Sequence, residues 1–130
     1  MNVDFVYNTD FKLNNEVETT QWINTFCKSE GFSIDSLVFA FFNDKELKDL
    51  NVRFLNHDYF TDVISFDESY DGFVKGNIAI SIDRVKENAS EFSCSFDDEL
   101  RRVIIHGVLH FMGFNAVSYT HLTLPTNREV

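Results

Sequence analysis

The spacing of apolar and polar positions predicts a strand followed by a helix at the start of the chain. The range 3–7 alternates strictly between apolar and polar residues, as in a short strand with one apolar face. A helix is expected to begin near Asn15, which precedes Glu18 by three residues as in a capping box, and to end at Gly31. Within it the residues that face the core recur every three or four positions: Thr19, Trp22, Ile23, Phe26 and Cys27.

The centre of the chain carries the signals of three strands and a helix. An unbroken apolar run over 37–42 predicts a buried strand, and apolar residues at helical spacing predict a helix over 44–55. The ranges 63–66 and 78–82 are expected to form an antiparallel hairpin with a wide loop of roughly ten residues, because Asp71-Gly72 and Lys75-Gly76 lie between them.

Two helices are expected after this hairpin, a short one over 83–91 and a longer one near the C-terminus. Ser95 is followed by Asp98 three residues later and then by Glu99, which is an N-terminal helix signal, and Gly113 is the expected end. The predicted fold class is α+β: a single small mixed sheet with helices packed on it. We expect one domain over 1–115 and no internal repeat.

The composition fits a single domain with a substantial core. The chain has 130 residues, of which 44% are hydrophobic, and no apolar run approaches the ~18 residues that a membrane span needs. The first residues lack a signal-peptide pattern, so a cytoplasmic protein is expected, and Cys27 and Cys94 are expected to be reduced thiols. The net charge of −10 argues against extensive phosphate contacts, although a local patch or a metal ion can dominate a site.

The strongest chemical signal is His106 and His110, four residues apart in the apolar helical segment 100–112. Residues at this spacing lie on one stripe of a helix, so both imidazoles can reach one metal ion. The alternative is that each ring sits at the edge of the core and bonds a backbone carbonyl. A zinc protease has Glu directly after its first histidine, whereas this chain has Gly107, which disfavours peptide hydrolysis and indicates close packing of another segment or a ligand.

Three ordered segments resemble one known family. His-Gly-Val-Leu-His-Phe-Met-Gly-Phe at 106–114 is similar to the signature of the YbeY-type endoribonucleases, the bacterial rRNA maturation factors. Leu50-Asn51 with Thr-Asp-Val-Ile-Ser-Phe at 61–66, and Gly-Asn-Ile at 76–78, resemble two further family segments. Three matches in order are far more specific than a histidine pair alone.

The resemblance implies a metal-dependent endoribonuclease that cleaves single-stranded RNA in maturation of small-subunit rRNA. Its cofactor would be one zinc ion held by three histidines, His106 and His110 among them. Its partners would be rRNA and the ribosomal small subunit or associated proteins, with neither membrane nor DNA. The competing interpretation is a non-catalytic ribosome-assembly factor whose metal ion is structural.

The chain departs from the family pattern after the second histidine. The third ligand should fall six residues after His110, where this sequence has Ala116, and the family aspartate before it is Asn115. The segment 116–130 has no helical period and resembles translated adapter sequence, so we expect it to be non-native and the domain to be truncated. His121 lies in that segment and is a poor substitute ligand, because ligands need positioning by packed structure. Zinc binding and catalysis are therefore expected to be impaired.

Other candidate site residues carry weaker signals. An arginine that some family members are thought to use in catalysis aligns with Leu55, and Arg53 lies on a different helical face. Arg101 and Arg102 flank the histidine helix and are candidates for RNA contact, although exposed or ion-paired arginines are the norm. The candidate pocket-lining residues, which cap, turn or strand roles explain equally well, are Thr61, Asp62 and Ser65. His57 is expected to sit in a polar loop without a role.

Overall fold

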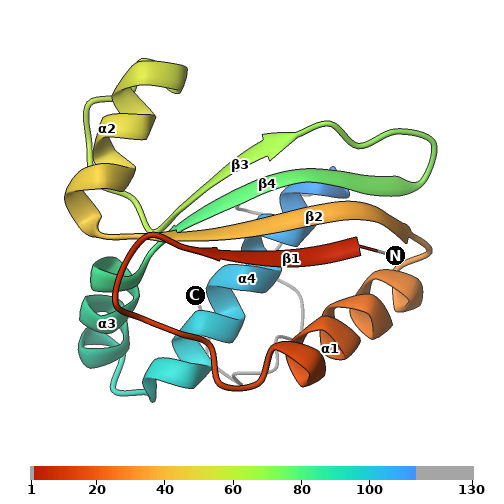
Figure 1. Ribbon diagram of the computed structural model, residues 1–130, viewed down its shortest axis with the longest axis horizontal. Helices are drawn as coiled ribbons and strands as arrows, with labels where there is room; N and C mark the ends of the chain where they lie inside the picture. Colours follow the sequence, from red (N-terminus) through yellow and green to blue (C-terminus); the bar gives the residue numbers. More distant parts are fainter. Residues whose placement is uncertain (1, 114–130) are drawn as a thin grey trace.

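The computed structural model describes residues 2–113, which form four strands and four helices (Figure 1). In chain order they are β1 (Asn2–Tyr7), α1 (Glu16–Ser29), β2 (Ser33–Phe42), α2 (Asp44–Leu55), β3 (Val63–Asp67), β4 (Phe73–Ser81), α3 (Ile82–Glu91) and α4 (Phe96–Phe111). The strands make one mixed sheet in the order β1-β2-β4-β3, parallel except for the β3–β4 pair. The α+β class and the single mixed sheet are confirmed.

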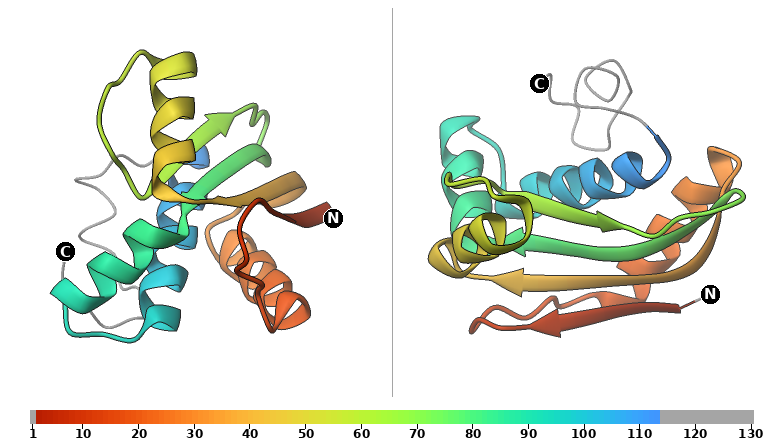
Figure 2. Two further views of the ribbon diagram at one scale, coloured as in Figure 1. Left: turned by 60° about the vertical axis from the view of Figure 1, so that its left-hand side comes forward. Right: turned by 90° about the horizontal axis from the view of Figure 1, so that it is seen from above.

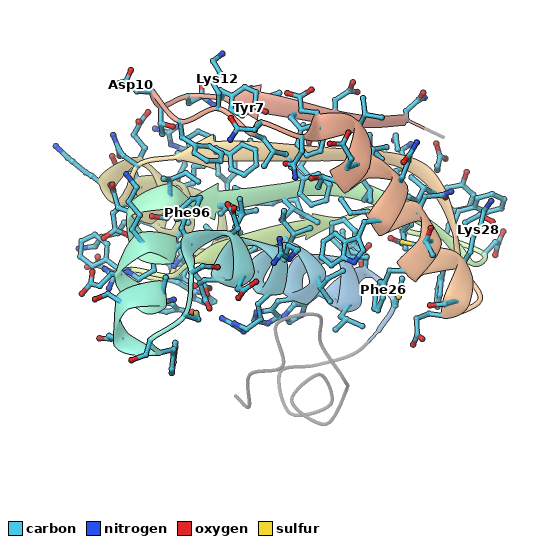
Figure 3. The ribbon with its side chains drawn as sticks, turned by 90° about the horizontal axis from the view of Figure 1, so that it is seen from below. Tyr7, Asp10, Lys12, Phe26, Lys28 and Phe96 are labelled. Carbon is cyan, nitrogen blue, oxygen red and sulfur yellow. The ribbon has the colours of Figure 1, made fainter. Side chains whose placement is uncertain are left out.

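The helices divide unequally between the two faces of the sheet. Figures 1 and 2 show α1, α3 and α4 on one face, while α2 stands alone at one end of the other face. The main core lies between the sheet and the three-helix layer, where Phe39, Phe41, Ile78 and Ile80 are fully buried. Figure 3 shows Phe26 of α1 on this layer, where it packs against a second, smaller cluster formed by Ile105 and Leu109 of α4. The helix α4 is thereby fixed against the sheet.

The β3–β4 hairpin is tighter than the sequence pattern predicts. The expected wide loop is wrong, because β4 begins at Phe73 and includes Lys75 and Gly76. Asp71 and Gly72 both have positive φ, +46° and +79°, as a two-residue type I′ turn requires. Tyr70 and Phe73 exchange backbone hydrogen bonds of 3.0 and 2.6 Å around it. The Asp-Gly pair alone therefore closes the hairpin.

Helix starts follow the predicted signals with one exception. Ser95 accepts a hydrogen bond from the backbone N–H of Asp98 at 3.0 Å and caps α4 as expected. The expected capping box at Asn15 is wrong: its side chain makes no capping hydrogen bond, and its φ and ψ of −133° and 56° are not those of a typical cap. There the backbone carbonyl of Asn15 accepts from Thr19 at 2.9 Å instead.

Gly76 is the position in the sheet at which a side chain is least tolerable. Its φ is +151°, and a Cβ there would lie 2.2 Å from the carbonyl oxygen of Phe66. We expect Gly76→Ala to lower the free energy of unfolding by roughly 3–5 kcal/mol, since backbone strain and overpacking add. Gly31→Ala is the control, because Gly31 also has positive φ but open space around it, and it should cost only about 1 kcal/mol. Equal losses in urea unfolding would contradict this account of Gly76.

Candidate metal and RNA site

The two histidines of α4 converge at one point. Their Nε2 atoms are 3.0 Å apart, and their rings are stacked with centroids 4.8 Å apart. His110 is exposed and lies in the last turn of α4, whereas His106 is only partly exposed. The shared helical stripe predicted from the sequence is thus the observed arrangement.

Gly107, between the histidines, brings α4 close to the sheet. A Cβ at this position would lie 2.9 Å from Cγ2 of Ile78 on β4. The Ser65 hydroxyl of β3 also donates to the carbonyl oxygen of Gly107 at 3.5 Å. The expected close packing of another chain segment is confirmed, and it holds the histidines beside β3.

A cleft of about 350 Å³ joins the histidines to the residues that precede and form β3. It contains the histidine pair and the three pocket-lining candidates, together with residues of α2 and of the loop after it. Its lining consists of Asn51, Leu55, His57, Tyr59, Thr61, Asp62, Val63, Ile64, Ser65, His106 and His110. The structure therefore brings together most of the residues singled out in the sequence, while their binding roles stay predictions.

His106 has the electrostatic character of a neutral imidazole. Burial, together with smaller contributions from the neighbouring His110 and Arg102, lowers its pKa to about 4. At neutral pH the ring is uncharged, which is the form in which histidine binds a metal ion.

The histidine pair matches two positions of a tetrahedral zinc site. Two nitrogens bound to one zinc ion at about 2.0–2.1 Å are separated by about 3.3 Å in that geometry, close to the observed 3.0 Å. Across residues 2–113, however, no group of three or more His, Cys, Asp or Glu side chains is placed to hold a metal. The positions that bear on the third ligand, Asn115, Ala116 and His121, lie outside the described residues.

A buried charge network lies behind the cleft. The Arg102 guanidinium is 4% exposed and bonds the fully buried Glu99 carboxylate at 2.9 Å. It also pairs with Asp62 at 3.4 Å, and the Asn88 amide donates to the same Asp62 oxygen at 3.5 Å. Arg102 is thus placed to position Asp62, with little surface left for phosphate. Arg101 forms an ion pair with Asp98 and remains partly exposed, so its RNA contact stays a prediction.

Asp62 gives this network a pH dependence. Burial raises its pKa, nearby Arg102 lowers it to a smaller extent, and Glu99 raises it. A raised folded-state pKa contributes stability that is present below about pH 4 and is lost as the pH rises through the folded value. We therefore expect Asp62→Asn to become more stable relative to the unmodified protein as the pH rises from about 4 to 8. Urea unfolding at both pH values measures this, and a relative stability that falls with pH would contradict it.

The roles of three parts of the site were not predicted from the sequence. The buried Asn51 anchors the loop after α2, and the Glu99–Arg102 pair anchors Asp62. His57, expected to have no role, lines the cleft. The sequence signal for the charge network was the three-residue spacing of Glu99 and Arg102 in one predicted helix.

Fold and cleft together define an α+β protein with a two-histidine site at the edge of its sheet, and comparison with known proteins places it in a family. The family model described as endoribonuclease YbeY matches residues 5–122. That match includes the first residues of the segment 116–130. The chain belongs to the endoribonuclease YbeY family.

Individual relatives agree with this assignment. The chain is 38% identical over 127 residues to endoribonuclease YbeY of Flavobacterium johnsoniae, covering 98% of this chain and 91% of the relative. It is 44% identical over 127 residues to the same-named protein of Christiangramia forsetii, with 98% and 89% covered. A solution structure from Thermotoga maritima aligns with a TM-score of 0.65 at 28% identity, over 87% of this chain and 73% of that one.

None of the helices in residues 2–113 is both long enough and apolar enough to cross a bilayer.

Proposed function

We propose that this protein is built as a zinc-dependent endoribonuclease for single-stranded RNA in small-subunit rRNA maturation, acting in the cytoplasm. The observation that carries the proposal is the convergence of the His106 and His110 Nε2 atoms, 3.0 Å apart, in a cleft. The family's endoribonuclease name supports RNA as the substrate class.

The chain's own residues have separable tasks in this proposal. His106 and His110 would hold the ion as neutral imidazoles, and a bound zinc ion supplies a water of lowered pKa and polarises a phosphoryl oxygen. Gly107 and Ser65 keep the histidine helix against β3. The buried Glu99 and Arg102 side chains hold Asp62 at the cleft wall.

We propose that zinc binding and RNA cleavage are both impaired in this chain. A catalytic zinc site uses three protein ligands and keeps one open position, and the resemblance implies a third histidine at position 116, where this chain has alanine. With two imidazoles the ion is weakly held and poorly oriented, so cleavage should be near background.

A second candidate function is a non-catalytic ribosome-assembly factor with a structural metal. Two observations favour it: among the described residues that line the cleft none is Lys or Arg, and Arg102 is committed to an internal network. The two functions separate in one experiment, cleavage of labelled single-stranded RNA by a variant with the third histidine restored. Tight zinc binding without cleavage would select the assembly factor.

A further inference from the structure

Two aromatic side chains form a flat pair on the wall of the histidine cleft. The rings of His57 and Tyr59 stack with centroids 5.2 Å apart and planes 18° apart, and the Tyr59 hydroxyl bonds Nδ1 of His57 at 2.9 Å. Both residues line the same cleft as His106 and His110. Tyr59 is 52% exposed, so much of its ring remains available to a ligand.

The loop that carries this pair is held in place by α2. Asn51, which is 1% exposed, donates its side-chain amide to the Tyr59 carbonyl at 3.1 Å. The backbone carbonyl of the same Asn51 accepts from the His57 N–H at 3.1 Å. One buried residue therefore fixes both members of the pair, and presenting them to a ligand costs little ordering entropy.

The next residue anchors the other side of the loop. The Phe60 ring lies under two cations, the Lys48 ammonium at 4.6 Å and the Arg84 guanidinium at 5.4 Å from its centroid. Lys48 also pairs with Asp58 of the loop at 3.5 Å. These contacts involve Phe60 and Asp58, so they leave the Tyr59 ring uncovered by the cations.

An exposed, pre-positioned aromatic ring beside the histidine cleft matches the chemistry of an unpaired nucleobase. Every base has a π-face that stacks on an aromatic side chain without help from charge. This matters in a protein of net charge −10 whose cleft lining, in the described part, has neither Lys nor Arg. We propose that Tyr59, backed by His57, is a stacking subsite for one base of single-stranded RNA. This inference rests on the proposed function of the cleft and names a side chain that would bind the substrate.

The hairpin turn supplies a matched control. Tyr70 and Phe73 form a second exposed stacked pair, with ring centroids 5.5 Å apart and planes 25° apart. They lie at the end of β3 opposite the 56–62 loop (Figure 1). Tyr70→Ala therefore removes an aromatic ring of similar exposure away from the cleft.

The test is equilibrium binding of the 130-residue chain to two fluorescent probes at low salt. One probe is a short single-stranded RNA, and the other is the same sugar–phosphate backbone without bases. We expect Tyr59→Ala to weaken binding of the RNA roughly five- to one-hundred-fold and to leave the abasic probe unchanged. Tyr59→Phe should stay within about twofold because the ring remains. Tyr70→Ala should leave both affinities unchanged.

The outcomes separate this inference from the proposed function. If the unmodified chain binds the RNA and Tyr59→Ala binds it equally well, the stacking subsite is wrong while an RNA-binding cleft stands. An equal loss for RNA and abasic probe, or a loss as large in Tyr70→Ala, also overturns it. If the unmodified chain binds neither the RNA nor its abasic analogue, both the stacking subsite and the proposed RNA function are wrong. Circular dichroism of each variant shows whether a loss of binding comes from unfolding.

Discussion

Replacing Ala116 with histidine, within a C-terminal segment of family-like sequence, is expected to tighten zinc binding by about 100-fold or more. The resemblance to the family signature implies a third ligand at this position, six residues after His110. Loss of a group that merely orients a ligand already costs about 10- to 100-fold in metal affinity, so gain of a ligand itself should exceed that range. Competition with a zinc-chelating dye measures the affinity.

The control for this experiment is the same family-like segment with alanine kept at 116. It separates the effect of the added ligand from the effect of exchanging the C-terminal segment. Two variants with equal zinc affinity would show that position 116 does not supply a ligand. The variant with histidine at 116 in the family-like segment is called the restored chain below. His106→Ala in the restored chain should lose most of the gain in zinc affinity, because it returns the site to two ligands.

RNA cleavage is expected to follow metal affinity. The chain as written should cut single-stranded RNA at a rate near background, whereas the restored chain should cut it in a reaction that EDTA abolishes. His110→Ala in the restored chain should reduce cleavage by at least about 100-fold, because the ion then lacks one of its fixed ligands. Gel analysis of an end-labelled RNA gives the rates, with Tyr70→Ala in the restored chain as the control for an unrelated substitution.

Two results would contradict the catalytic account. One is robust, EDTA-sensitive cleavage by the present chain that is lost in His106→Ala, which would mean that Ala116 does not limit the site. The other is a restored chain that binds zinc tightly and never cuts RNA. The second result would move the function to ribosome assembly, with the ion in a structural role.

Local patterns predicted much of the fold because they are direct consequences of short-range geometry. The helix over 44–55 has the observed bounds of α2, since its apolar spacing and its Asn43 cap agree. The β3–β4 pairing followed from two apolar runs, but its loop was misjudged because Lys75 and Gly76 look like a turn. Gly76 is in fact needed inside the strand, where Phe66 and Phe111 leave no room for a side chain. A single sequence does not distinguish these two uses of glycine.

The site was predictable where its residues share an element and hidden where tertiary packing joins them. His106 and His110 share one helix stripe, so their spacing alone placed them together. Asp62 and Arg102 are far apart in the sequence and meet only because β3 lies against α4. Such a pairing has no periodic signature. The same holds for Asn51, whose side chain anchors a loop that reads as ordinary polar sequence.

The central claim is that His106 and His110 bind one metal ion, and X-ray absorption at the zinc edge tests it most directly. The sample is the 130-residue chain with one equivalent of zinc, compared with the double variant His106→Ala/His110→Ala. The account predicts two histidine nitrogens at about 2.0–2.1 Å in the unmodified chain and their loss in the double variant. A spectrum without imidazole scattering, or one that the double variant reproduces, would contradict it.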